Sequence, residues 1–288
     1  MYNSVHGWGQ DPVVLQTLAD LRRWRSLLRS SGKRLAFVPT MGALHEGHLE
    51  LVRQGMKKAD AVLVSIFVNP TQFAPHEDLA AYPRTWDADL EKLTALGVHG
   101  VFCPSVSEIY PDGFSTAVSV SGISAPLEGA HRPGHFDGVA TVVAKLLLMA
   151  LPDMALFGEK DWQQLQVVRR MVADLNIPVD VEGVPIVRDE NGLALSSRNA
   201  YLSEEQYKIA CVLNKTLFTM VDKIKAGESY PEVRQWGIER LEQAGFDGID
   251  YLEIRDAGTL ELPGEKSPLR LLAAVMLGRA RLIDNVPV

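Results

Sequence analysis

The chain has 288 residues, of which 47% are hydrophobic and 23% charged, and its mean hydropathy is +0.01. These values are typical of a folded globular protein that is long enough to bury a substantial core, and they exclude a disordered or fibrous chain. The formal net charge of -7 argues against a surface devoted to nucleic acid, which normally carries clustered Lys and Arg.

The first half of the chain alternates short β-branched runs with amphipathic stretches. Strands are predicted at residues 34–39, 61–68, 99–104 and 154–157, and helices at residues 48–59, 86–97, 137–150 and 161–175. Right-handed crossovers place such strands in one parallel sheet with helices on both faces. We therefore predict an α/β fold with a doubly wound parallel sheet.

The second half begins with a turn signal. Residues 179–197 have β-rich flanks around Asp-Glu-Asn-Gly at 189–192, which predicts a hairpin or a hinge-like crossing. Ser203 and Gln206 form a capping-box pattern that opens a helix running towards residue 225. A helix at residues 231–244 and strands at 249–256 and 269–278 follow. We predict two domains, residues 1–185 and a smaller α+β domain at residues 186–288.

Three features bear on location. Residues 1–14 lack a basic region followed by an apolar one, so we expect no secretory signal. The longest apolar stretch, around residues 139–151, is interrupted by Lys145 and is too short to span a bilayer. Cys103 and Cys211 have no paired spacing, so neither a disulfide framework nor a zinc ribbon is expected. We expect a cytoplasmic protein without a membrane anchor.

The sharpest functional signal is PTMGALHEGHLELV at residues 39–52, which follows a predicted strand and opens a predicted helix. Ligands of open α/β sheets bind beyond the carboxyl ends of strands, where a helix N-terminus offers unpaired N–H groups to phosphate. Gly42 permits close backbone approach, and His45 and His48 project from the same side of the first turn. Imidazole N–H groups there can stabilise a pentacoordinate phosphorus, which is nucleotidyl-transfer chemistry.

Two alternatives compete with this interpretation of the histidines. They could merely cap the helix or lie on the surface. They could also bind zinc, with His131 and His135 as a second pair, although Pro133 interrupts that second pair and HEGH is one residue short of the zincin pattern.

Polar residues also follow the strand before residue 69 and precede the helix near residue 137. Asn69 and Gln72 in FVNPTQF carry amides that suit a ligand with hydroxyl and carboxylate groups, or Asn69 is only the cap of a Pro-containing turn. Arg132 in HRPGHFDGVATVV could hold a carboxylate in a bidentate fork, or lie on a surface loop.

Two further segments could bind phosphate. In FGEKDWQQLQ, Lys160 at a helix N-terminus opposes the helix dipole unless an anion lies beside it, although a solvated lysine is the usual case. In LALSSRNAYLS, Ser196, Ser197 and Arg198 can grip phosphate oxygens, or form a polar loop before a capped helix. GEKS at residues 264–267 lacks the upstream glycine of a P-loop, which excludes that mechanism.

PTMGALHEGH, FVNPTQF, HRPGHFDGVATVV, GEKDWQQL and LSSRN, in this order and at these separations, resemble the pantothenate synthetase family from about residue 34 to residue 202. The resemblance implies a Rossmann-like ATP- and pantoate-binding catalytic domain, related to class I aminoacyl-tRNA synthetases, a C-terminal lid domain and a homodimer. The implied ligase reaction belongs to pantothenate biosynthesis: it condenses pantoate with β-alanine through a pantoyl adenylate, using ATP and Mg²⁺ and giving pantothenate, AMP and pyrophosphate.

The resemblance also implies roles for particular residues. The catalytic groups would be His48, His45, Lys160 and Arg198. The ATP site would comprise Met41, Gly42, Ala43, Leu44, His45, Glu46, Gly47 and His48, then Gly158, Glu159, Lys160 and Asp161, then Val187, Leu195, Ser196, Ser197 and Arg198. Gln72 and Gln164 would hold pantoate, with Asn69 and Arg132 as further substrate-binding candidates.

No side chain is assigned to the metal, although Asp89 is a carboxylate near the right region. Leu195 departs from the family, which often has Met there, but an apolar and backbone contact tolerates Leu.

Three rival functions stay open at this point. A nucleotidyltransferase would use the same histidine motif but make a stable nucleotide product, so free AMP separates it from a ligase. A zinc-stabilised binding module would contain bound metal and would not turn over ATP. A noncatalytic nucleotide sensor would not need the groups that the motifs supply for a second ligand.

Overall fold

The computed structural model describes residues 11–73, 79–264 and 267–288. Most of the opening segment considered as a secretory signal and the middle of the GEKS sequence lie outside these ranges. The described chain forms two compact units. The first comprises the residues up to Ser121, Arg132–Gly158 and Val167–Val184, and the second comprises Gly122–His131, Glu159–Gln166 and Pro185–Val288.

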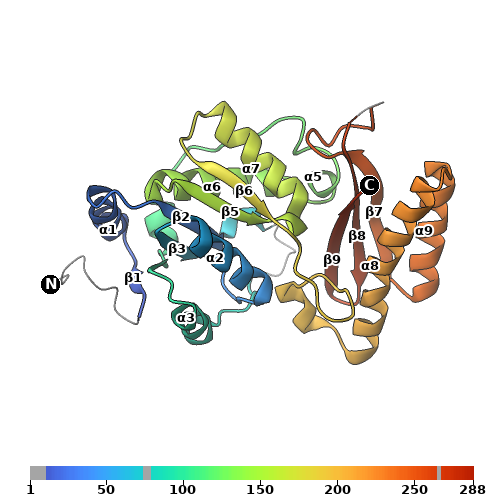
Figure 1. The fold of residues 1–288 in the computed structure, drawn as a ribbon, viewed down its shortest axis with the longest axis horizontal. Helices are drawn as coiled ribbons and strands as arrows, with labels where there is room; N and C mark the ends of the chain where they lie inside the picture. The colour runs from blue at the N-terminus through green and yellow to red at the C-terminus, as the bar shows by residue number, and fades with distance from the viewer. Residues whose placement is uncertain (1–10, 74–78, 265–266) are drawn as a thin grey trace. The chain divides into compact units, whose positions relative to one another are not determined.

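The first unit is built on a six-stranded sheet in which every pairing is parallel (Figure 1). In spatial order the strands are β1 (Val13–Leu15), β4 (Gly100–Phe102), β3 (Ala61–Ile66), β2 (Leu35–Thr40), β5 (Met154–Gly158) and β6 (Asp180–Val184). The central strands β2 and β3 are apolar over most of their length because both of their faces are buried under helices.

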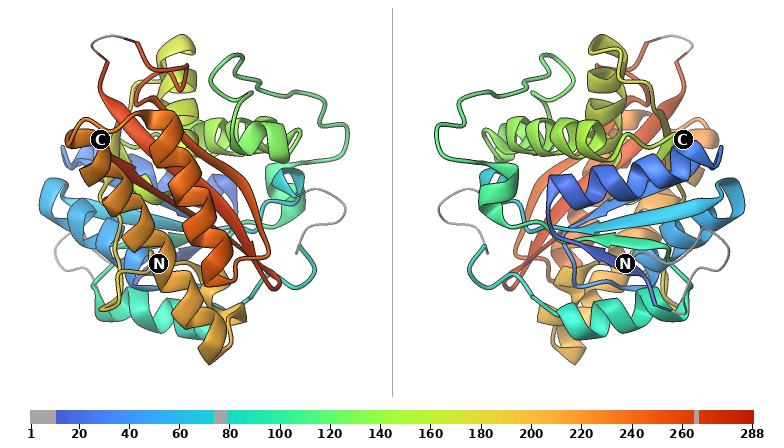
Figure 2. Two further views of the ribbon diagram at one scale, coloured as in Figure 1. Left: turned by 90° about the vertical axis from the view of Figure 1, so that its right-hand side faces the viewer. Right: turned by 90° about the vertical axis from the view of Figure 1, so that its left-hand side faces the viewer.

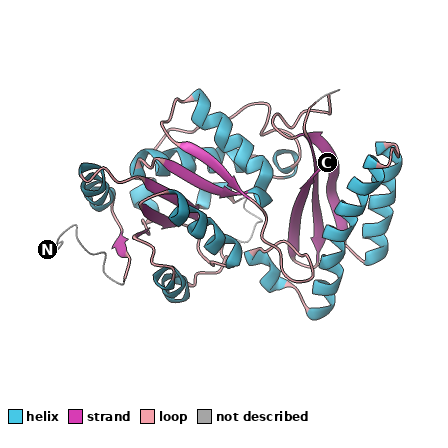
Figure 3. Cartoon of the chain, in the orientation of Figure 1, coloured by secondary structure: helices cyan, strands magenta, loops and turns pink. Residues whose placement is uncertain are grey.

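Helices cover both faces of this sheet, as Figure 3 shows in cyan against magenta. Helices α2 (Glu46–Lys58) and α3 (Trp86–Ala95) pack on one face. Helices α1 (Leu18–Ser30) and α6 (His135–Ala150) lie on the other, and α7 (Trp162–Asp174) connects β5 to β6. A short helix, α4 (Val106–Ile109), follows β4.

The strand order creates a switch point at β2. From β2 the chain winds outward through β3 to β4, and later returns to the other side of β2 with β5 and β6. Ligands of open α/β sheets bind outside the carboxyl ends of the strands at such a point. Three of the five sequence motifs lie in the segments that begin at the ends of β2, β3 and β5.

The second unit contains an antiparallel sheet of β7 (Gly248–Asp256), β8 (Leu269–Leu277) and β9 (Ala280–Pro287). Helices α8 (Glu204–Lys225) and α9 (Tyr230–Ala244) lie side by side over one face, as the left view of Figure 2 shows. The short α5 (Glu128–His131) and the neighbouring Leu127 and Trp162 pack against the other face. The fold-class prediction, a doubly wound parallel sheet with a smaller α+β part, is confirmed.

The turn and cap signals of the second half are confirmed. The Ser203 hydroxyl accepts the Gln206 N–H, and the Gln206 side chain accepts the Ser203 N–H at 3.0 Å, so the capping box opens α8. Arg188 and Ala194 form an antiparallel bridge around the turn at residues 189–192. Within the described ranges, no helix has the length and apolar character that a membrane crossing requires.

The elements absent from the sequence prediction include helix α1 and strand β9. Helix α1 buries Leu21, Trp24 and Leu28 at helical spacing, a signal that the sequence carries. Strand β9 is harder to recognise, because Asp284 and Asn285 occupy its interior and both residue types are poor strand formers.

Candidate active site

The loop after β2 is held in an unusual backbone conformation. Gly42 and Ala43 have φ values of +81° and +50°, and an alanine in this region costs about 1 kcal/mol. The Asp89 carboxylate, which is 1% exposed, accepts the N–H groups of Ala43 and Leu44, each at 2.8 Å. Lys92 Nζ donates to the Leu44 carbonyl at 2.6 Å. Helix α3 therefore fixes the loop that leads into α2.

His45 and His48 are oriented by the N-terminus of α2. His45 is the N-cap, and its Nδ1 accepts the Gly47 N–H at 3.1 Å. His48 Nδ1 accepts the backbone N–H of His45 at 3.3 Å, and the ring centroids lie 4.1 Å apart. Because backbone N–H groups only donate, both Nδ1 atoms are unprotonated, and each neutral ring carries its hydrogen on Nε2.

The helix-capping interpretation thus describes the Nδ1 atoms, and it is compatible with the catalytic one. Capping selects the tautomer in which each imidazole is an Nε2–H donor, the form that can donate to a phosphate oxygen. The zinc alternative gains no support, since no three His, Cys, Asp or Glu side chains gather as a metal site in the described part of the chain.

Asn69 organises the turn after β3. It is 1% exposed and caps the short 3₁₀ helix η1 (Pro70–Gln72), where its Oδ1 accepts the Thr71 N–H. The same oxygen accepts the Tyr110 hydroxyl at 2.8 Å, and Nδ2 donates to Gln72 Oε1 at 3.1 Å and to the Gly138 carbonyl at 3.2 Å. The amide is used within the protein, so its effect on a ligand would pass through Gln72.

Gln72 connects the first two motifs. Its Nε2 lies 3.0 Å from the Met41 sulfur, in the segment after β2. Its backbone carbonyl lies 2.9 Å from His135 Nδ1, and His135 Nε2 lies 3.1 Å from Arg132. Because a guanidinium only donates, His135 Nε2 accepts and Nδ1 donates to the carbonyl. The first unit therefore brings Met41, Asn69, Gln72 and Arg132 into one connected group.

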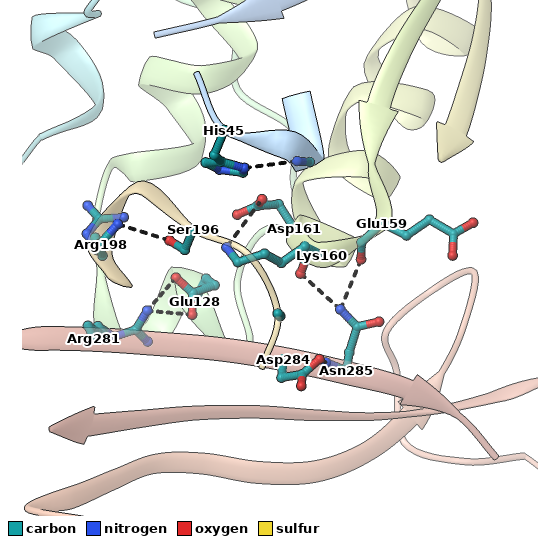
Figure 4. A network of polar contacts seen from close by, with 12 residues as sticks. His45, Glu128, Glu159, Lys160, Asp161, Ser196, Arg198, Arg281, Asp284 and Asn285 are labelled. Carbon is teal, nitrogen blue, oxygen red and sulfur yellow. Dashed lines mark hydrogen bonds and ion pairs between the residues drawn. The ribbon is translucent and has the colours of Figure 1, made fainter. Parts of the chain in front are cut away.

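Lys160 lies in a short 3₁₀ helix, η2 (Glu159–Asp161), of the second unit. Its Nζ is 3.8 Å from Asp161 Oδ2, and the side chain is 19% exposed, so it is not an ordinary solvated lysine. The anion beside it is thus the neighbouring carboxylate. Asn285 donates to the main-chain carbonyls of Glu159 and Lys160 (Figure 4).

The Ser196–Arg198 segment belongs to the same unit. Ser196 caps the 3₁₀ helix η3 (Ser197–Tyr201), and its hydroxyl accepts the Arg198 N–H at 3.3 Å. Leu195 N–H donates to the Val187 carbonyl at 3.0 Å. Lys160, Ser196 and Asp284 are among the residues that line a cavity of ≈ 10 Å³, room for about one water molecule.

The predicted residues fall into two groups. The first unit carries the 41–48 loop, Asn69, Gln72, Arg132 and Gly158, and the second carries Glu159 to Asp161, Gln164, Val187 and Leu195 to Arg198. That both groups act on one ligand stays a prediction. The sequence did not predict that other polar residues hold the motif residues, or the turn before them, in place: Asp89, Tyr110, His135, Asp284 and Asn285. Asp284 and Asn285 do give a sequence signal, because they are polar residues inside a mainly apolar strand. Asp89, Tyr110 and His135 give none of this kind, since they lie in a mixed helix or at the ends of helices.

Comparison with known proteins identifies the family. Residues 13–287 match the family model described as pantoate-beta-alanine ligase. The chain belongs to this family. Like other pantoate-beta-alanine ligases it is an enzyme of the ligase class, which confirms the resemblance inferred from the five motifs.

Similar members of the family cover nearly the whole chain. The chain is 53% identical over 277 residues to the pantothenate synthetase of Paramagnetospirillum magneticum, with 96% of this chain and 97% of the relative covered. The crystal structure of pantothenate synthetase from Thermus thermophilus has a TM-score of 0.89 and 47% identity, covering 95% of this chain and 98% of that one. The pantoate-beta-alanine ligase of Francisella tularensis, complexed with beta-gamma ATP and beta-alanine, has a TM-score of 0.80 and 33% identity, with coverage of 96% and 97%.

Proposed function

We propose that the chain condenses pantoate with β-alanine at the expense of ATP, giving pantothenate, AMP and pyrophosphate. The observation that carries the proposal is the pair of Nε2–H imidazoles at the N-terminus of α2, in a chain of the pantoate-beta-alanine ligase family. The ligands in the complex of the Francisella tularensis relative agree with ATP and β-alanine as substrates.

In the first step, the pantoate carboxylate attacks the α-phosphorus of ATP and pyrophosphate leaves, which yields a pantoyl adenylate. His45 and His48 donate from Nε2 to the phosphate oxygens, where negative charge grows in the transition state. Lys160, Ser196, Ser197 and Arg198 supply further donors. Gln72 and Gln164 hold pantoate. Arg132 is connected to Gln72 through His135, which bonds to both residues.

In the second step, the neutral amine of β-alanine attacks the acyl carbon of the adenylate and expels AMP. The smaller C-terminal domain, residues 186–288, acts as a lid over the Rossmann-like catalytic domain and keeps water from the acyl adenylate. Exclusion of water matters because an acyl adenylate hydrolyses to AMP and free acid.

Magnesium enters with ATP as part of the substrate. Mg²⁺ is usually held by substrate phosphates and one or two carboxylates rather than by an all-protein cage. The Asp89 carboxylate already accepts two N–H groups of the 41–48 loop and the Thr85 hydroxyl, so we assign it to that loop. We also propose that the enzyme is a cytoplasmic homodimer, which sedimentation of the purified protein tests.

The decisive experiment follows products in the presence and absence of β-alanine. With ATP, Mg²⁺ and pantoate alone, the protein should exchange labelled pyrophosphate into ATP. Addition of β-alanine should release AMP and pantothenate in equal amounts. No exchange with pantoate, and no AMP with any related hydroxy acid, would contradict the proposal. A stable nucleotide conjugate as product would favour the nucleotidyltransferase instead.

A further inference from the structure

Strand β9 of the second unit carries two adjacent polar residues that are almost completely buried. Asp284 is 3% exposed and Asn285 is 2% exposed. Successive strand residues point to opposite faces of a sheet. Asp284 is therefore on the face covered by α8 and α9, and Asn285 is on the face that contacts Trp162.

Asn285 is bonded to the segment that carries Lys160. Its Nδ2 donates to the carbonyls of Glu159 and Lys160, each at 2.9 Å, and both amide hydrogens are thereby used (Figure 4). Its Oδ1 accepts from Arg270 Nε at 2.5 Å, and Arg270 also lies 3.3 Å from the Glu159 carboxylate. The Arg270 guanidinium stacks 3.4 Å from the centroid of the Trp162 ring. The Glu159–Trp162 backbone is thus fixed from the sheet.

Asp284 is bonded to Arg188, which flanks the turn that precedes Ser196 to Arg198. Its carboxylate accepts hydrogen bonds from both terminal nitrogens of Arg188, at 2.6 and 2.8 Å, in a bidentate pair. Arg188 also donates to the Gly192 carbonyl at 3.2 Å and bridges to Ala194, and so closes the turn before the serines. The pair is partly or fully buried on both sides, which limits screening by solvent.

The two residues are coupled to each other as well as to their segments. The backbone N–H of Asn285 donates to the Asp284 carboxylate at 2.7 Å. A buried polar group in a strand interior is costly unless its hydrogen bonds are satisfied. Here Asn285 bonds to a segment that the sequence motifs single out for nucleotide binding, and Asp284 bonds to Arg188, next to the predicted nucleotide-site residue Val187.

We infer that Asp284 and Asn285 are positioning residues. Through their bonds from strand β9, they fix the positions of the Lys160 segment and the Ser196–Arg198 segment relative to each other. Neither contacts the reacting atoms. Asn285 acts through the carbonyls on either side of Lys160, and Asp284 acts through Arg188. The inference rests on the proposed function for its catalytic consequence, but its structural part is independent of any substrate.

The first test uses unliganded protein and measures hydrogen–deuterium exchange by peptide. Asn285→Asp keeps the acceptor for Arg270 and removes the two N–H donors. It should raise exchange in residues 159–165 and leave residues 187–198 near the wild-type level. Asp284→Asn removes the charge that pairs with Arg188. It should raise exchange in residues 187–198 and leave residues 159–165 near the wild-type level, and Arg188→Lys should do the same. Val233→Ala is the control, because it loosens the buried core under α9 without touching either segment.

The second test measures pantoate-dependent pyrophosphate exchange. Misplacement by about 1 Å can cost about a hundredfold in rate, so Asn285→Asp and Asn285→Ala should each lower kcat by about that factor. Val233→Ala, with a comparable loss of Tm, should keep kcat within about threefold. Equal exchange of both segments in all variants, or a wild-type kcat in the folded Asn285 variants, would overturn the inference. If the wild-type protein shows no pyrophosphate exchange, the proposed function fails instead, while the deuterium pattern still decides the positioning role.

Discussion

At the scale of single residues, the histidine motif has two functions in one ring. Each imidazole uses Nδ1 to satisfy an N–H group at the N-terminus of α2, and so keeps Nε2–H for a ligand. A substitution that removes the ring removes both functions at once. Two variants at His48 can separate them.

His48→Asn tests the catalytic assignment. The Asn Oδ1 occupies the place of the imidazole Nδ1 and can accept the His45 N–H, so Tm should change little. The Nε2–H donor is lost, and pyrophosphate exchange should fall by about a hundredfold or more. His48→Ala should lose activity to the same extent and also about 1 kcal/mol of stability through the lost cap. A loss of rate below about threefold in the folded Asn variant would contradict the assignment.

Asp89→Asn tests whether this carboxylate holds the 41–48 loop. An amide can accept only one of the two loop N–H groups well, because its nitrogen faces the other. For a 1% exposed group we expect a loss of about 1–3 kcal/mol in stability and a lower affinity for ATP. Raised Mg²⁺ concentration should not restore the affinity. Restoration by magnesium would show a metal ligand instead. Asp87→Asn, an exposed position on the same helix, is the matched control.

The sequence predicted which residue types gather near a phosphate, but not how they are held. His45, Asn69 and Lys160 were each recognised from a strand followed by a polar segment. Asp89, which accepts the N–H groups of Ala43 and Leu44, lies 46 and 45 residues away from them. Asn285, which donates to the Lys160 carbonyl, lies 125 residues away from Lys160. Such pairings depend on tertiary packing, for which a single sequence carries no local signal.

At the scale of elements, α6 and η1 meet at an unusually close contact. Gly138 lies in α6, and a Cβ added to it would be 2.4 Å from the Thr71 carbonyl oxygen. Its own carbonyl accepts the Asn69 amide. The absence of a side chain at this position lets α6 support the turn that carries Gln72.

Gly138→Ala should therefore move η1 away from α6. We expect the KM for pantoate to rise by about tenfold or more, because Gln72 is displaced, and Tm to fall because overpacking costs about 1–3 kcal/mol. Steady-state kinetics with pantoate as the varied substrate measure the first effect. Gly258→Ala is the control, since its Cβ would meet nothing closer than the Asp256 carboxylate at 3.5 Å. An unchanged KM for pantoate in Gly138→Ala would show that η1 does not position Gln72 for pantoate.

Element prediction was reliable where burial produces a simple period. The runs at β2 and β3 are apolar except for Thr40 and Ser65 near their ends, and α8 begins at a capping box, so both kinds of element followed from local patterns. Strand β9 was missed because Asp284 and Asn285 interrupt its apolar pattern. Their polar groups are satisfied only by residues from distant segments.

At the scale of the whole molecule, the chain does not divide into two consecutive blocks. Residues Gly122–His131 and Glu159–Gln166 belong to the second unit although they lie within the first 185 residues. Glu128 shows why: its carboxylate accepts the Tyr251 hydroxyl at 2.7 Å and Arg281 at 2.8 Å. A change in composition along the sequence reports only contiguous boundaries, so a sequence cannot reveal such an exchange of segments.

The stability of the molecule should depend on pH through His99, at the junction of β3 and β4. Its Nδ1 accepts the Val62 N–H at 3.1 Å, which requires the ring nitrogen to be unprotonated. Burial lowers the pKa of His99, and nearby Lys33 lowers this pKa further. The unfolded chain therefore binds a proton near the ordinary pKa of about 6.5, while the folded chain resists protonation until a lower pH.

The stabilisation is consequently complete above about pH 6.5 and is lost as the pH falls towards the lowered pKa of the folded state. His99→Asn offers an Oδ1 in place of Nδ1 and has no group that titrates in this range. Between about pH 7.5 and pH 5.5 the Tm of the wild-type protein should fall more than the Tm of the variant. The carboxylates common to both proteins cancel in that difference. Equal losses of Tm would show that His99 keeps an ordinary pKa in the folded chain.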